Sequence, residues 1–171
     1  MRTHFTHRGL LALTLALATL APAALADSGR LLPRDVPVAY RQECAACHTA
    51  YAPGMLPAAS WQRIMAGLDR HYGSDASLDD ATVRQLSTWL QAHAGTYKRV
   101  AEAPPQDRIT RSAWFERKHR RIDAAVWNHA SVNSAAQCAA CHSRAAQGDY
   151  EDDSLRFPPG LDTRQRGAWK H

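Results

Sequence analysis

The feature that most constrains this chain is a pentapeptide, C-A-A-C-H, which occurs at residues 44–48 and again at residues 138–142. All four cysteines of the sequence lie in these two copies. Two thiols at positions i and i+3 lie on one side of a helical turn, where both can form thioether bonds with the vinyl groups of one haem. The adjacent histidine can then bind the iron. The sequence therefore predicts two covalently attached haem c groups, with attachment residues Cys44, Cys47, His48, Cys138, Cys141 and His142.

The first 26 residues have the pattern of a secretory signal peptide. A basic start with Arg2 and Arg8 precedes an apolar run over residues 10–20, which ends at a small-x-small site at residues 24–26. The apolar run is too short for a stable membrane span, and an uncleaved anchor is the alternative. We expect cleavage after residue 26 and export to the periplasm, which leaves residues 27–171 as the mature dihaem domain.

Three other uses of paired cysteines compete with haem attachment. A thioredoxin-type site needs a βαβ context, and no strand-like alternation surrounds either motif. A zinc site could draw on both motifs, although zinc ribbons rarely carry a directly adjacent histidine twice. Two disulfides would suit an exported protein of this size. Against all three, no cysteine lies outside a haem motif, and export provides the compartment in which such attachment occurs.

The overall charge does not indicate a nucleic-acid partner once processing is considered. The whole chain has a net charge of +5 and a pI near 9.3. Removing Arg2 and Arg8 leaves 19 basic and 16 acidic residues, a net charge of +3. The four propionates of two haems bring this close to zero, so nucleic-acid binding loses its electrostatic support. No later segment approaches the length of a transmembrane helix, so we expect a protein that is not integral to the membrane.

Apolar residues in the mature chain recur at helical spacing, and no segment alternates convincingly with the period of a strand. We therefore predict an all-α fold, a small two-lobed helical cytochrome with one c-type haem in each lobe. The first lobe covers about residues 40–95 and the second about residues 109–158. The predicted helices run from Ser60 to Gly73, from about Asp79 to Gly95, and from about Ser112 through His129.

The second axial ligand of each iron has to come from outside the motifs. Methionine is one usual ligand, but the mature chain has only Met55 and Met65, both in the first half. Histidine on both irons is the economical solution. The remaining candidates lie on or near apolar helical faces, and they are His71, His93, His119 and His129.

Spacing favours two of these histidines. His71 lies 23 residues after His48, and His119 lies 23 residues before His142. Each gap can hold one helix and a turn, which is about the length needed to pass from one face of a haem to the other. Because His93 and His129 occupy comparable faces, both stay open as alternatives.

At this level of detail the chain resembles the small exported dihaem cytochromes c of proteobacteria. The resemblance spans nearly all of residues 40–158. The matching residues are 44–48, 51–61, 64–73 and 76–79 in the first half, and 109–110, 114–115, 118–120, 138–142, Ala145 and Gly148 in the second. His71 and His119 fall where the motifs of the family carry a histidine. At Met55 the resemblance leads us to expect leucine, which reopens methionine as a ligand of the first haem.

The resemblance implies histidine on both sides of each iron, with His48, His71, His119 and His142 as the metal ligands. It implies a protein without catalysis of its own that passes electrons to redox protein partners. In some members the partner is an oxygen-binding monohaem cytochrome c. We therefore expect a periplasmic electron carrier; the alternatives are a gas-binding or peroxidase-like haem protein with one open iron, and a haem-bearing subunit docked to a membrane cytochrome.

Overall fold

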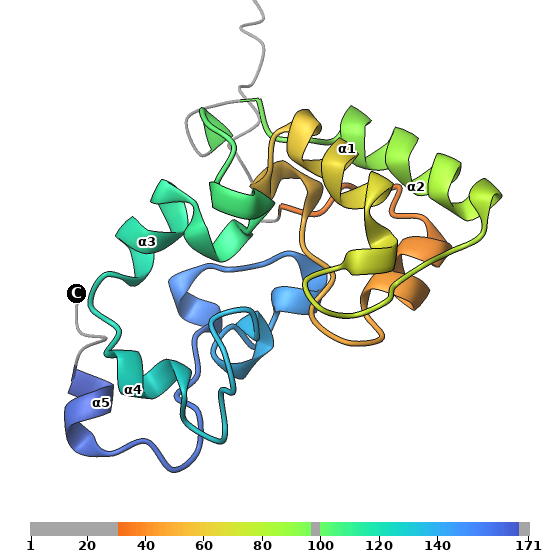
Figure 1. Cartoon of the computed structure of the whole chain (residues 1–171). Helices are drawn as coiled ribbons and strands as arrows, with labels where there is room; N and C mark the ends of the chain where they lie inside the picture. The colour runs from red at the N-terminus through yellow and green to blue at the C-terminus, as the bar shows by residue number, and fades with distance from the viewer. Residues whose placement is uncertain (1–30, 97–99, 168–171) are drawn as a thin grey trace, which may run out of the picture.

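The computed structural model describes residues 31–96 and 100–167, so the predicted signal peptide lies outside the described residues. Short helices joined by turns make up this part of the chain (Figure 1). No strand occurs among these residues, and the only bridge contacts join His71 to Ser74 and His142 to Leu155. The all-α prediction is confirmed. Within the same residues, no helix combines the length and apolar character needed to cross a bilayer.

Five α-helices lie in the described part of the chain: α1 (Ala58–Ala66), α2 (Asp80–Ala92), α3 (Ala113–His119), α4 (Ala124–Trp127) and α5 (Thr163–Gly167). A π-helical turn, η1 (Tyr40–Cys44), leads into the first motif. The 3₁₀ turns are η2 (Pro53–Met55), η3 (Leu68–Arg70), η5 (Pro105–Asp107), η6 (Ile109–Arg111), η7 (Cys138–Ala140), η8 (Ala145–Gln147) and η9 (Asp152–Ser154).

The helices α1 and α2 pack against each other at one end of the molecule (Figure 1). Helix α2 begins where the sequence predicts, because the side chain of Asp79 accepts hydrogen bonds of 3.0 Å from the backbone nitrogens of residues 81 and 82. Helix α1 differs from its prediction. It begins at Ala58 behind the extended Pro57, and Ser60 lies buried inside its first turn instead of capping it. It ends at Gly67, whose backbone leaves the helical region.

The predicted long helix through His129 is wrong, because the chain breaks it after His119. The Ser112 hydroxyl accepts a 3.1 Å hydrogen bond from the backbone nitrogen of Phe115 and starts α3, as expected. A new helix, α4, begins behind Asp123, whose carboxylate accepts a 2.9 Å bond from the backbone nitrogen of residue 125. A side chain that caps a new helix competes with continuation of the old one, and this explains the break.

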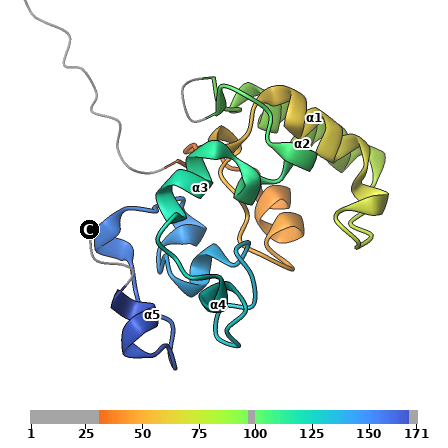
Figure 2. The same ribbon diagram turned by 60° about the vertical axis from the view of Figure 1, so that its left-hand side comes forward.

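The apolar core falls into two clusters of buried side chains. The larger consists of Leu32, Tyr40, Ala52, Met55, Leu56, Trp61, Met65, Leu86, Trp89, Leu90 and Ile109, and Tyr150 packs against it. The smaller consists of Val126, Val132 and Leu161, and Figures 1 and 2 both place α4 beside α5 around it. Because residues 32 and 150 join the larger cluster from outside the predicted first lobe, the lobe boundaries stay a prediction.

A backbone contact joins the start of the described chain to the second half. The backbone nitrogen of Leu31 donates a 2.8 Å hydrogen bond to the carbonyl oxygen of Gly148. Gly148 has φ +73°, and a Cβ atom there would lie 2.6 Å from the backbone nitrogen of Leu32. Glycine is needed here for both the backbone conformation and the close approach.

Candidate haem-binding sites

The four cysteines of the two motifs are free, and three of them, Cys44, Cys138 and Cys141, are partly shielded by the surrounding chain, while Cys47 is exposed. Neither motif is closed by a disulfide. Burial raises the pKa of Cys44, Cys138 and Cys141 to about 11. Redox-active cysteines of the thioredoxin type have a lowered pKa. The raised pKa of these three thiols therefore argues against thioredoxin-type chemistry. The described residues also hold no group of three or more His, Cys, Asp or Glu side chains arranged around a bare metal ion, which the zinc interpretation requires.

The first motif histidine lies opposite His71. The ring centres of His48 and His71 are 6.2 Å apart, and the ring planes are inclined by 18°. The Nδ1 atom of His48 donates a 2.7 Å hydrogen bond to the carbonyl oxygen of Thr49, which leaves Nε2 as the atom that can bind a metal. Burial lowers the pKa of His71, and the nearby His48 and Arg108 lower it further, so this ring stays neutral at neutral pH.

The second motif histidine lies opposite His119 at the same spacing. The ring centres of His119 and His142 are 6.2 Å apart, with planes inclined by 74°. The Nδ1 atom of His119 donates a 2.9 Å hydrogen bond to the carbonyl oxygen of Phe115 and again leaves Nε2 available. Burial lowers the pKa of both histidines. The Nδ1 atom of His142 is buried without a hydrogen-bond partner, so packing against Tyr150, 5.4 Å between ring centres, orients this ring.

The spacing of both pairs fits one iron between two imidazoles. A metal–nitrogen bond of an imidazole is about 2.0–2.1 Å, and the ring centre lies about 1.2 Å behind the nitrogen. Two imidazoles bound in line on opposite sides of a metal therefore have ring centres about 6.4 Å apart. The observed 6.2 Å at both sites agrees with this value. The residues present fit a haem iron at each site.

The alternative ligands are engaged elsewhere. The Nε2 atom of His93 pairs with the carboxylate of Asp35 at 3.2 Å. The ring of His129 lies against Gly160, where an added Cβ atom would be 3.1 Å from its Cε1 and 3.4 Å from its Nε2 atom, and its Nδ1 atom is 2.8 Å from the hydroxyl of Ser131. Met55 and Met65 belong to the larger core cluster and are 4% and 7% exposed, which favours a packing role for both. Of the histidines left open by the sequence, the structure brings His71 and His119 to the motifs.

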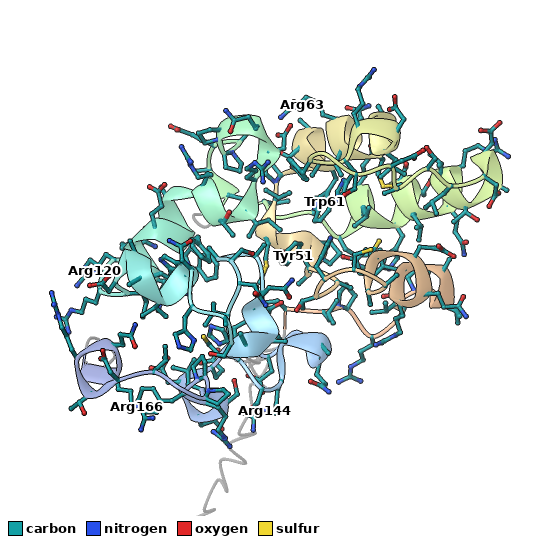
Figure 3. The ribbon with its side chains drawn as sticks, turned by 60° about the horizontal axis from the view of Figure 1, so that its bottom comes forward. Tyr51, Trp61, Arg63, Arg120, Arg144 and Arg166 are labelled. Atoms are coloured by element: carbon teal, nitrogen blue, oxygen red, sulfur yellow. The ribbon has the colours of Figure 1, made fainter. Side chains whose placement is uncertain are left out.

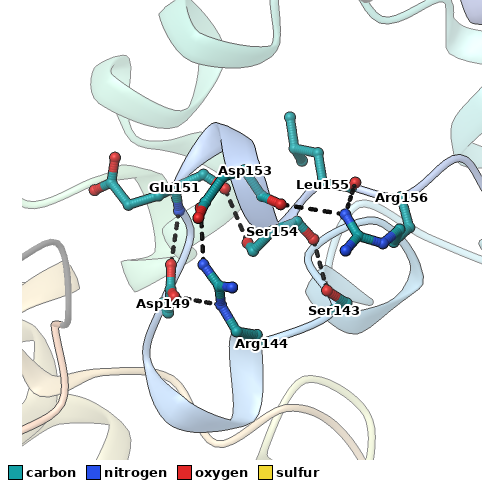
Figure 4. Close-up of polar contacts among 8 residues, drawn as sticks. All are labelled: Ser143, Arg144, Asp149, Glu151, Asp153, Ser154, Leu155 and Arg156. Carbon is teal, nitrogen blue, oxygen red and sulfur yellow. Dashed lines mark hydrogen bonds and ion pairs between the residues drawn. The ribbon is translucent and has the colours of Figure 1, made fainter.

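Polar contacts hold the segment that follows the second motif (Figure 4). Arg144 forms ion pairs of 2.6 Å with Asp149 and 2.7 Å with Asp153. The hydroxyl of Ser143 donates a 2.7 Å hydrogen bond to the carbonyl oxygen of Ser154. Since residues 143 and 144 directly follow His142, these contacts restrain the chain that carries this histidine.

Sequence reasoning assigned no role to the aromatic side chains that lie against the candidate ligands. Tyr51 stacks on His48 with ring centres 4.9 Å apart, and Phe115 stacks on His119 at 4.0 Å. Spacing contained a usable signal for Phe115, which precedes His119 by four residues on the same helix. Tyr51 follows His48 by three residues in a non-helical segment, so helical spacing does not predict that contact. No such local signal exists for Tyr150, which reaches His142 from eight residues away.

Comparison with known proteins agrees with this geometry. The family model described as dihaem cytochrome c matches residues 40–150. A dihaem cytochrome c from Rhodobacter sphaeroides is 36% identical and has a TM-score of 0.61, with 68% of this chain and 98% of that chain covered. A dihaem cytochrome c from Shewanella baltica is 34% identical and has a TM-score of 0.63, with 74% of this chain and 97% of that chain covered. The search of curated proteins found no match. This chain therefore belongs to the dihaem cytochrome c family and carries two covalently bound haem c groups.

Proposed function

We propose that the protein is a periplasmic electron carrier in which two histidines bind each haem iron, His48 with His71 and His119 with His142. The observation that carries this proposal is the equal 6.2 Å spacing of the two pairs, with a motif histidine in each. The family membership supports an electron-transfer role, because dihaem cytochromes c are electron carriers.

Each haem supplies an iron that accepts and releases one electron. The protein holds the donor atoms in place: backbone carbonyls fix the Nδ1 atoms of His48 and His119 and direct their Nε2 atoms away. A pair of imidazoles on each iron leaves no exchangeable position for a substrate. Without a methionine sulfur, both irons are expected to have low potentials for c-type haems. The site is therefore suited to electron transfer and not to catalysis.

Export and partners belong to the same proposal. Covalent haem attachment through C-x-x-C-H suits a protein outside the cytoplasm, and residues 1–26 have the composition of a cleavable leader. We propose redox proteins of the same compartment as partners, either an oxygen-binding monohaem cytochrome c or a membrane cytochrome. Purified protein is then expected to have the mass of residues 27–171 plus two haems.

The test is carbon monoxide binding by the unmodified, reduced protein, monitored in the Soret band. We expect no spectral change at stoichiometric carbon monoxide, and we expect both ferric irons to give low-spin signals in electron paramagnetic resonance. A reductive titration should take up one electron per haem. Stoichiometric carbon monoxide binding would refute closed coordination and support the gas-reactive alternative.

A further inference from the structure

One side chain of the first half reaches the attachment segment of the second haem. The ring of Tyr51 lies against the ring of His48, with centres 4.9 Å apart and planes inclined by 23°. The hydroxyl of Tyr51 donates a 2.7 Å hydrogen bond to the carbonyl oxygen of Ala136, 85 residues away and two residues before Cys138. Figure 3 shows Tyr51 in the middle of the molecule, where the ribbons of the two halves meet.

Two further tyrosines surround this contact. The hydroxyl of Tyr40 donates a hydrogen bond to the backbone carbonyl of Tyr51 and so fixes the chain that carries the Tyr51 ring. Tyr150 lies edge-on against His142 with ring centres 5.4 Å apart. Tyr40 is thus tied to the backbone of Tyr51, and Tyr150 to the motif histidine that follows Ala136 in the chain.

Building on the proposed function, we propose that Tyr51 is a positioning residue that couples the two haems. Its ring contacts the histidine of the first haem, and its hydroxyl holds the attachment segment of the second haem. The contact path runs from the ring of His48 through the ring and hydroxyl of Tyr51 to residues 136–138, where Cys138 is bonded to the second haem. Tyr51 thus links the motif histidine of the first half to the attachment segment of the second through a single side chain.

The transfer that this path serves is a single-electron exchange. With both haems bound, one electron would pass between them, so that one would be oxidised as the other is reduced, while Tyr51 would hold the two attachment segments in place. No proton moves and no bond forms or breaks. Tyr51 keeps its phenolic proton and its oxidation state throughout, and it acts only through its position.

A matched set of tyrosine variants tests this role. Tyr51→Phe keeps the ring against His48 and removes only the hydroxyl. The control is Tyr72→Phe, which also loses one hydroxyl bond to a backbone carbonyl, the 3.0 Å bond to Gln106, yet leaves the bond to Ala136 intact.

The readout is the rate of electron exchange between the haems in half-reduced holoprotein, measured from the haem-methyl signals in nuclear magnetic resonance spectra. We expect Tyr51→Phe to slow this exchange several-fold and Tyr51→Leu, which also removes the ring, to slow it further. The control Tyr72→Phe should exchange at the parental rate. The methyl shifts of the fully oxidised protein should stay unchanged in Tyr51→Phe, because its haem surroundings are intact.

The outcomes separate this inference from the proposed function. Exchange in Tyr51→Phe at the parental rate would overturn the inference, and so would equal slowing in Tyr72→Phe. Neither result would affect the assignment of an electron carrier. The proposed function fails instead when the parent protein binds carbon monoxide or when only one of its irons can be reduced, and this is measured independently of any tyrosine variant.

Discussion

Replacing His119 by alanine is expected to open the second haem and leave the first one closed. The ring centres of His119 and His142 are 6.2 Å apart. Among the described residues, His119 is the proposed second ligand of this iron, so its removal leaves one coordination position open. The second iron should become high-spin when oxidised and bind one carbon monoxide per chain when reduced. His71→Ala should do the same at the first haem, and the double variant should bind two.

Removing the His119 ring should also lower the unfolding free energy, because the ring makes two stabilising contacts. The hydrogen bond from Nδ1 to the carbonyl of Phe115, 2.9 Å, contributes about 1 kcal/mol net. The stacked pair with Phe115, 4.0 Å between ring centres, contributes about 0.5–1.5 kcal/mol. The variant should therefore lose about 2 kcal/mol of unfolding free energy before the bond to iron is counted.

Titration of reduced protein with carbon monoxide gives the number of open irons, and unfolding in guanidinium chloride gives the stability. His129→Ala is the matched control, because this histidine follows in the same region but the Cε1–Nε2 edge of its ring lies against Gly160, where an added Cβ atom would be 3.1 Å from Cε1. The control should bind no carbon monoxide. Equal binding by His129→Ala and His119→Ala, or no binding by His119→Ala, would refute the ligand assignment.

Three further changes test the fold around the sites. Leu86→Ala, at a position with 0% exposure, should cost about 2–5 kcal/mol in chemical denaturation while both haems stay covalently attached. Gly148→Ala and Gly73→Ala should each lose about 1–2 kcal/mol of unfolding free energy, because both positions have a positive φ. Of the two, Gly148→Ala should have the lower melting temperature, because its Cβ atom would lie 2.6 Å from the backbone nitrogen of Leu32, whereas at Gly73 nothing lies within 4 Å. Hydrogen bonds with Thr82 hold the pKa of Asp79 below its ordinary value. The stabilisation of the fold by the ionised carboxylate is therefore present at neutral pH and lost in acid. The urea midpoint of Asp79→Ala should therefore lie below that of the parent at neutral pH, and the difference should narrow as the pH falls through the folded-state pKa of Asp79.

The features that the sequence predicted well are those set by nearby residues. The start of α2 depends on Asp79 and the two backbone nitrogens that follow, all within four residues. The start of α3 depends in the same way on Ser112. The haem attachment motifs are likewise local, since the spacing of the thiols and the histidine within five residues carries the chemistry.

The predictions that were wrong concern where helices end. An apolar pattern through Ile122, Val126 and His129 is satisfied equally by one long helix and by two short ones. The side chain of Asp123 caps the start of α4, and this local interaction favours two short helices, α3 and α4, over one long helix. His71 was placed on a helix for the same reason, but α1 ends at Gly67 and a 3₁₀ turn carries the chain to it. Its place opposite His48 depends on contacts across the fold, which periodicity does not contain.

The two motifs are identical in sequence, yet the chain surrounds them differently. At the first site, Tyr51 stacks nearly parallel on His48, and the two histidine planes differ by 18°. At the second site, Tyr150 meets His142 edge-on with planes inclined by 64°, and the two histidine planes differ by 74°. The spacing of the histidine rings is the same at both sites, while their orientations and their aromatic neighbours differ. Because groups outside the iron ligands adjust the properties of a metal centre, two haems with the same attachment motif have unequal environments in this fold.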